Sequence, residues 1–70
     1  MKKEMTKLLK SYILKYNSLK ADLYLDEMLG VDVKYVKGKI YELNDVIYDM
    51  AAILDIELNM DIKGYIVIAE

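Results

Sequence analysis

The sequence contains no cysteine, histidine, arginine, tryptophan or phenylalanine. Without cysteine no disulfide can form, and without cysteine or histidine there is no thiolate or imidazole ligand for a zinc site. The same absences exclude serine–histidine and cysteine–histidine nucleophilic pairs and leave only Ser/Thr–Lys variants. The three aliphatic hydroxyls, Thr6, Ser11 and Ser18, lie in the lysine-rich first segment, which we expect to be a solvated surface. We therefore predict that the protein is not an enzyme and that it has no metal site and no cofactor.

The positive charge that is present comes from lysine alone and is unevenly distributed. Residues 1–20 hold six lysines against one acid, a balance of +5, whereas residues 21–70 hold four lysines against eleven acids, a balance of −7. Such a polarity orients and steers binding, either to another molecule or to a second copy of the chain.

Size and composition favour a subunit of an oligomer. With 70 residues the chain forms one domain, residues 1–70, whose own core supplies only about 3–5 kcal/mol of net stability. Yet 56% of the residues are apolar, and no disulfide is available to add stability. We therefore predict a homodimer. All seven aromatic residues are tyrosine, a side chain enriched at surfaces that are solvated in the free protein and buried in a complex. The alternative is that the tyrosines line the rim of a small core.

No segment of the sequence has the pattern of a membrane span or a secretory signal. Lys7, Lys10 and Lys15 interrupt any apolar run after the opening Met-Lys-Lys, and no apolar stretch approaches the ~18 residues needed to cross a bilayer. A basic amphipathic helix could lie on an anionic membrane, but that mode favours a Trp or Phe anchor. We expect a soluble, cytoplasmic protein that does not bind membranes.

The first thirty residues follow the helical period. Apolar residues recur at intervals of three and four, which predicts a helix over residues 5–16 and another over residues 21–29. Asn17-Ser18 offers a break between them, with Ser18 as a candidate N-cap. Without that cap the two segments merge into one long bent helix, and the sequence leaves both options open. Gly30 follows the second of these segments, at the position just beyond a helix where glycine commonly ends it.

Residues 31–54 are ambiguous at their beginning. Asp32 is a candidate cap for a helix whose inner positions are spaced three and four apart from Val33 to Leu54. Against this, residues 31–36 are rich in β-branched side chains, and Lys37-Gly38 suits a hairpin turn. We favour a helix over residues 40–53, with Gly38 marking its start because glycine costs a helix about 1 kcal/mol relative to alanine. Whether residues 31–39 are helix or hairpin stays open.

The period changes to two at the end of the chain. Apolar and polar residues alternate strictly over residues 54–63, which predicts a half-buried strand, and residues 65–68 predict a second one. The turn between them is either residues 59–61 or Lys63-Gly64. The predicted fold class is α+β: a small single domain with two or three N-terminal helices followed by a C-terminal β-hairpin.

Residues 24–40 resemble a helix-turn-helix. The resemblance implies that the following helix presents lysines to a DNA groove and that the terminal hairpin is the wing of a winged helix. Asp26 stands where the motif has a small residue, no arginine is available to contact guanine, and the wing is acidic. The motif's apolar and glycine positions are held by Leu25, Leu29, Gly30, Val31 and Val36. The DNA-binding residues that it implies are Lys34, Lys37 and Lys39.

The preferred hypothesis is a non-enzymatic protein–protein interaction module. Such a chain would be an adaptor, inhibitor or small regulator of the kind that phages and plasmids carry, with a DNA-binding transcriptional regulator as the alternative. We expect the partner to be a protein that contacts exposed tyrosines and an acidic helix face. The predicted contact residues are Tyr12, Tyr16, Tyr35, Tyr41, Tyr48, Glu42, Asp45 and Asp49.

Overall fold

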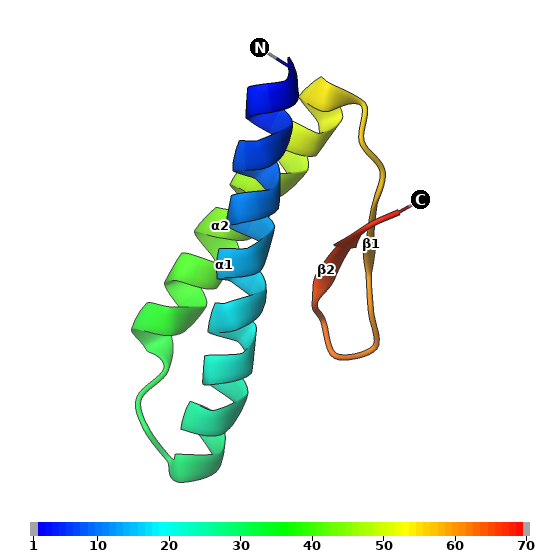
Figure 1. Ribbon diagram of the computed structural model, residues 1–70. Helices are drawn as coiled ribbons and strands as arrows, with labels where there is room; N and C mark the ends of the chain where they lie inside the picture. The colour runs from blue at the N-terminus through cyan, green and yellow to red at the C-terminus, as the bar shows by residue number, and fades with distance from the viewer. Residues whose placement is uncertain (1, 70) are drawn as a thin grey trace.

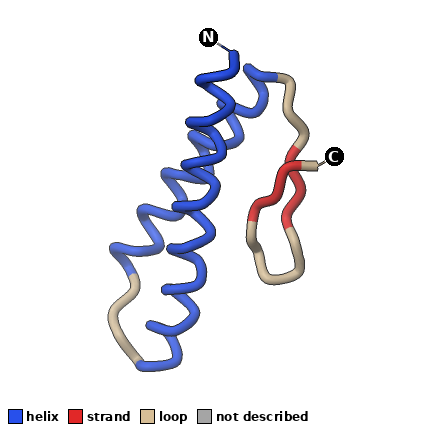
Figure 2. The backbone as a smooth tube through the Cα atoms, viewed as in Figure 1, coloured by secondary structure: helices blue, strands red, loops and turns tan. Residues whose placement is uncertain are grey.

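The computed structural model, which describes residues 2–69, shows two long antiparallel helices with a short β-hairpin packed on one side of them (Figures 1 and 2). Helix α1 spans Lys2–Leu29 and α2 spans Lys34–Leu54. The strands are β1, Leu58–Met60, and β2, Ile66–Ile68. The predicted α+β class, with helices first and a hairpin last, is confirmed.

Helix α1 runs without interruption, so the predicted break at Asn17-Ser18 is wrong and the single-helix option is right. Ser18 is an exposed residue inside the helix and caps nothing. The Asn17 side chain instead leaves the helix to bind β2. Its Nδ2 donates to the Ile66 carbonyl at 3.0 Å, and its Oδ1 accepts from the Ile66 N–H at 2.8 Å.

The turn between the helices is built by Gly30 and Asp32. Gly30 has φ +75°, and the Val31 N–H donates to the Asp26 carbonyl at 3.0 Å, which is the C-terminal cap that a glycine makes easy. The Asp32 carboxylate then accepts the Lys34 N–H at 3.1 Å, so α2 begins at once. The hairpin option for residues 31–39 is therefore wrong, and Gly38 lies inside α2 rather than at its start.

Helix α2 ends one residue later than its periodic pattern suggested. Asp55 adopts the left-handed conformation with φ +58°, and the Ile56 N–H closes back onto the Ala51 carbonyl at 2.8 Å. Leu54 is the last helical residue and is buried. The predicted strand over residues 54–63 is thus too long, because its first residues form the end of α2 and the segment that leads to β1.

The β-hairpin is antiparallel, with Asn59 opposite Val67 at its centre. Of the two predicted turns, the one containing Gly64 is correct. The Asp61 carboxylate accepts the N–H groups of Lys63 and Tyr65, both at 2.9 Å. Gly64 has φ +87°, a conformation that a side chain disfavours.

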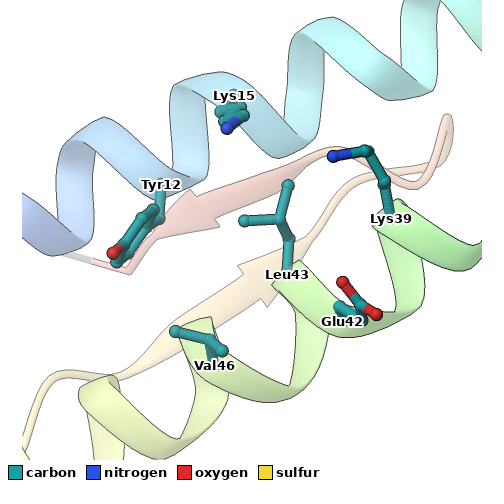
Figure 3. Close-up of a pocket in the computed structure, with 6 residues that line it drawn as sticks. All are labelled: Tyr12, Lys15, Lys39, Glu42, Leu43 and Val46. Atoms are coloured by element: carbon teal, nitrogen blue, oxygen red, sulfur yellow. The ribbon is translucent and has the colours of Figure 1, made fainter. Parts of the chain in front are cut away.

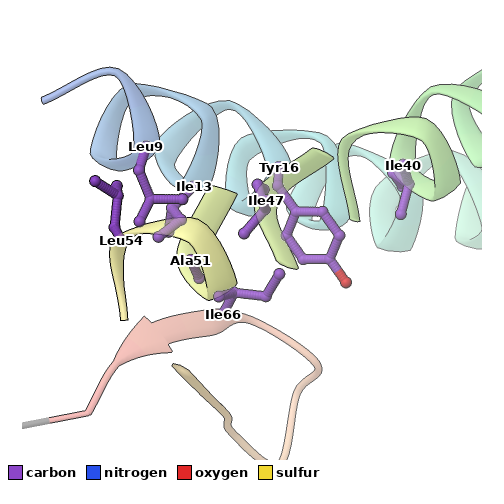
Figure 4. Packing of buried hydrophobic residues seen from close by; sticks show 8 residues of the cluster. All are labelled: Leu9, Ile13, Tyr16, Ile40, Ile47, Ala51, Leu54 and Ile66. Atoms are coloured by element: carbon purple, nitrogen blue, oxygen red, sulfur yellow. The ribbon is translucent and has the colours of Figure 1, made fainter. Parts of the chain in front are cut away.

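The core lies where the two helices and β2 meet (Figure 4). Ile66 is the contribution of β2, so the hairpin is needed to close this core. The Tyr16 hydroxyl donates to the Gly64 carbonyl at 3.3 Å and ties the helix to the hairpin turn. The buried residues are Leu9, Ile13, Tyr16, Ile40, Ile47, Ala51, Leu54 and Ile66.

Candidate protein-binding surface

Much of the apolar content of this chain lies on the outside. Among residues 2–69, fifteen large apolar side chains are exposed, whereas the buried core has eight residues. The chain exposes 5341 Å², while a compact monomer of 8.2 kDa exposes about 4,500 Å². Its radius of gyration of 13.0 Å likewise exceeds the ~11 Å expected for a compact domain of this length. The structure therefore has far more surface, and more of it apolar, than its size requires.

One exposed surface is the side of the helix pair that the β-hairpin leaves uncovered, which we call the open face. Asn17 points to the hairpin, and Lys15, two residues earlier and about 160° away around α1, points to the other side. Lys15 lines a groove of about 220 Å³ between the helices (Figure 3). Around the groove, Leu8 of α1 and Val46 of α2 are 46% and 43% exposed, and Ile53 of α2 is 73% exposed.

The groove carries charges of both signs. Lys15, Lys39 and Glu42 line it together with Tyr12, Leu43 and Val46. The Lys39 Nζ lies 5.2 Å from the centroid of the Tyr35 ring, a distance at which a cation and an aromatic face attract. Residues 2–69 contain one ion pair closer than 4.0 Å, between the Lys37 Nζ and the Glu27 Oε1 at 3.8 Å. The Glu42 carboxylate therefore has no ion-pair partner within that distance.

A second surface is the outer side of α2, away from α1, which we call the tyrosine–acid face. It consists of Tyr41, Asp45, Tyr48 and Asp49, whose spacing of three and four residues places them along one side of the helix. All four are exposed. Two amphipathic rings and two carboxylates thus stand together on a regular helix, where α2 holds them in fixed relative positions.

The other predicted contact residues are dispersed. Tyr16 is 2% exposed and belongs to the core, so it is not available to a partner, and its prediction as a contact residue is corrected. Tyr12 and Glu42 lie in the groove of the open face. Tyr35 is exposed near the start of α2, beside Lys39. The structure therefore brings together four of the eight residues on the tyrosine–acid face and two more on the open face.

The three lysines of the DNA-binding alternative do not all share one surface, because Lys34 and Lys37 lie one turn apart on α2 whereas Lys39 points elsewhere. Lys37 and Lys39 are two residues apart on α2 and point to nearly opposite sides of it. Lys37 is occupied by Glu27, and Lys39 lies over Tyr35. The helices on either side of Gly30 also run side by side and antiparallel (Figure 1), whereas a helix-turn-helix crosses them at roughly 90–120°.

The described residues offer little for acid–base or metal chemistry. Residues 2–69 contain no group of three or more Asp, Glu, His or Cys side chains placed to hold a metal ion, and none of their charged side chains is buried. Burial, with a smaller contribution from Tyr48, raises the pKa of Tyr16 above its ordinary value of 10.0. Neither helix in this part of the chain is sufficiently long and apolar to span a bilayer.

Sequence reasoning missed the open face because it assigned too many residues to the core. Leu8 and Val46 sit at helical spacing with truly buried neighbours, and the periodic pattern does not distinguish them. The available signal was the width of the apolar arc. On both helices it exceeds what one neighbouring helix can cover, and a β-hairpin covers only one flank.

The comparisons add no relative. Neither the protein-family models, nor the curated proteins, nor the solved structures contain a match to this chain. Function must therefore be argued from the surfaces of the chain itself.

Proposed function

We propose that this chain is a small cytoplasmic protein-binding module without enzymatic activity, acting as an adaptor, inhibitor or regulator. Its binding site is the tyrosine–acid face of α2. The observation that carries the proposal is the exposed pair Tyr41 and Tyr48, seven residues apart, with the carboxylates of Asp45 and Asp49 beside them.

The tyrosines of this face suit recognition of a protein. A tyrosine ring supplies a large apolar contact at the cost of ordering few rotatable bonds, and its hydroxyl stays solvated until a partner covers it. Tyr41 and Tyr48 are fixed on a helix rather than a loop, so binding requires little ordering of the backbone.

The carboxylates define the chemistry of the partner. Residues 40–62 contain six acids and no lysine, so the negative charge on this part of the chain is not compensated locally. Asp45 and Asp49 lie one turn apart on α2, a like-charge spacing that destabilises an isolated helix by about 0.2–0.5 kcal/mol. A protein surface rich in lysine or arginine would relieve this repulsion. We therefore propose a basic protein surface as the partner.

The test compares two pairs of tyrosines in the full-length chain. Proteins captured from the native cell extract by the wild type are compared with those captured by a Tyr41→Ala/Tyr48→Ala variant. The matched control is Tyr24→Ala/Tyr35→Ala, which removes two tyrosines that are exposed elsewhere. A protein that the wild type and the control retain and the variant loses is then purified.

The dissociation constant of that purified pair gives the decisive number. If Tyr41 and Tyr48 are central contacts, we expect the variant to bind at least about 30-fold more weakly, equivalent to about 2 kcal/mol, and the wild-type affinity to fall as salt is raised. An affinity that is equal for the variant and the wild type contradicts the proposed site.

A further inference from the structure

We infer that the open face of the helix pair is covered by a second copy of this chain, which produces a four-helix bundle with one β-hairpin on each outer side. This surface adjoins the tyrosine–acid face at Asp49, one turn before Ile53 on α2, and includes neither Tyr41 nor Tyr48. Four observations support it: the missing cover, the area, the apolar residues and the placement of charge.

The helix pair is covered on one side only. The hairpin packs on the side to which Ile13 and Asn17 point, and it closes the core there through Ile66. Nothing in residues 2–69 packs over the opposite side, where the groove of about 220 Å³ lies. Domains of this kind stack layers of elements around a core, so this half-open core lacks one layer.

The surplus surface equals what one partner of a dimer buries. The chain exposes 5341 Å², about 800 Å² more than a compact monomer of its mass. A standard stable interface buries about 800 Å² on each partner. The α2 helix is about 30 Å long and two packed helices span about 20 Å, so the open face has a projected area of about 600 Å², most of the area that such an interface needs.

The apolar residues of the open face suit another pair of helices. Leu8, Val46 and Ile53 are large, aliphatic and exposed, and Val46 lines the groove together with Leu43. Side chains of this kind at intervals of three, four and seven residues pack into the grooves of a facing helix in four-helix bundles. A second copy presents the same ridges and grooves.

The charge at the centre of the open face selects one symmetric arrangement. If α1 of one copy covered α1 of the other, Lys15, which lies at the midpoint of α1, would meet its own copy. If α1 instead covers α2 of the second copy, Lys15 faces Glu42, and the contact occurs twice because the dimer is two-fold symmetric. Leu8 then meets Ile53 of the second copy near the end of each helix.

This arrangement leaves both tyrosines of the proposed binding site free. Tyr41 and Tyr48 point away from the open face, whereas Asp49, one turn before Ile53, lies at its border. Each dimer therefore displays two copies of the tyrosine pair, on opposite edges. The dimer is therefore bivalent toward a partner that carries repeated or paired basic surfaces.

The first test measures the oligomeric state with one aspartate at a time. Sedimentation equilibrium is carried out on the wild type, on Ile53→Asp, and on Leu14→Asp as the matched control. Leu14 is 71% exposed, close to the 73% of Ile53, but lies on the side of α1 away from α2. Because both positions are exposed, both variants are expected to keep the helix content of the wild type by circular dichroism.

We expect the wild type and Leu14→Asp to be dimers with similar dissociation constants, and Ile53→Asp to dissociate at least about 30-fold more readily. A wild type that is monomeric up to about 100 µM overturns the inference, since a useful dimer forms below that concentration. So does an Ile53→Asp variant that dimerises as tightly as the wild type, or an equal effect of both substitutions.

The second test asks whether Lys15 and Glu42 meet across the interface. The variants Lys15→Glu and Glu42→Lys are each expected to be monomeric. In a homodimer of either variant, positions 15 and 42 carry the same charge, so like charges meet at both contacts. Mixed in equal amounts, they should form a heterodimer in which both contacts pair opposite charges. A repulsion within one chain would persist in the mixture, so a mixture that stays monomeric overturns the proposed pairing.

Discussion

Asn17 is the residue whose substitution we expect to detach the β-hairpin from the helices. Its side-chain amide binds both backbone groups of Ile66, with distances of 3.0 Å from Nδ2 to the carbonyl and 2.8 Å from the N–H to Oδ1. In this way the amide takes the place of a neighbouring strand along the edge of β2. The substitution Asn17→Ala removes both hydrogen bonds and leaves the rest of α1 in place.

The expected loss of stability follows from these two bonds. Each contributes about 1 kcal/mol net, so their removal costs about 2 kcal/mol. Alanine is a better helix former than asparagine and returns about 0.5 kcal/mol within α1. The net loss is therefore about 1.5 kcal/mol, which for a chain of this length lowers the melting temperature by about 10 °C.

The matched control is Ser18→Ala on the same turn of α1. Ser18 is exposed and binds nothing in the described chain, so this substitution gains helix propensity without losing a contact. Thermal and urea unfolding of wild type, Asn17→Ala and Ser18→Ala are followed by circular dichroism at one protein concentration, since any dimer makes stability depend on concentration. Amide exchange at Ile66 should accelerate in Asn17→Ala only.

The reasoning is refuted if Asn17→Ala and Ser18→Ala differ by less than about 0.5 kcal/mol, or if Ile66 exchange is unchanged. Either result would mean that water replaces the amide without cost, and that Ile66 burial alone holds the hairpin.

Two further predictions concern the core. Ile47 is fully buried, and Ile47→Ala is expected to lower the free energy of unfolding by about 2–5 kcal/mol, enough to unfold most of the molecules at room temperature. The same change at the fully exposed Ile62 should leave the urea midpoint unmoved. Tyr16 has a raised pKa, so its contribution to stability is fully present below about pH 10 and is lost as pH rises through the folded-state pKa. The free energy of unfolding, measured with urea from about pH 9 to pH 11, should therefore fall less steeply with pH for Tyr16→Phe than for the wild type. Equal slopes would contradict this account.

The sequence indicated the order of elements because periodicity is a local signal. The change from a period of three and four to a period of two separates α2 from the hairpin, and Gly30 ends α1 as expected. The errors fall where tertiary contacts decide. Asn17 looks like a helix breaker, but its amide is used by β2, and Gly38 lies inside α2, whose buried residues begin at Ile40. Asp55 ends α2 in a conformation usually left to glycine.

The candidate site was partly predictable for the same reason. Once α2 is a helix, the spacing of Tyr41, Asp45, Tyr48 and Asp49 places them on one side of it without further information. The fate of Tyr16 was not predictable in this way. Its burial depends on where the hairpin docks on α1, and that docking is fixed by residues about fifty positions away in the sequence.

The distribution of charge explains both the antiparallel pairing and what remains for binding. Both helices have lysines at their start, beside Glu4 in α1 and with no acid in the first turn of α2, and neither has a basic residue in its last turn, so these lysines oppose the helix dipole. Antiparallel packing brings the basic start of one helix beside the acidic end of the other, as the pair of Lys37 with Glu27 shows. Charges in the middle of the helices gain nothing from this pairing. Lys15 and Glu42 are the midpoint charges of the open face, and Asp45 and Asp49 lie beyond the reach of the lysines of α1. Lys15, Glu42, Asp45 and Asp49 are therefore charges that a partner on either of the two surfaces can still compensate.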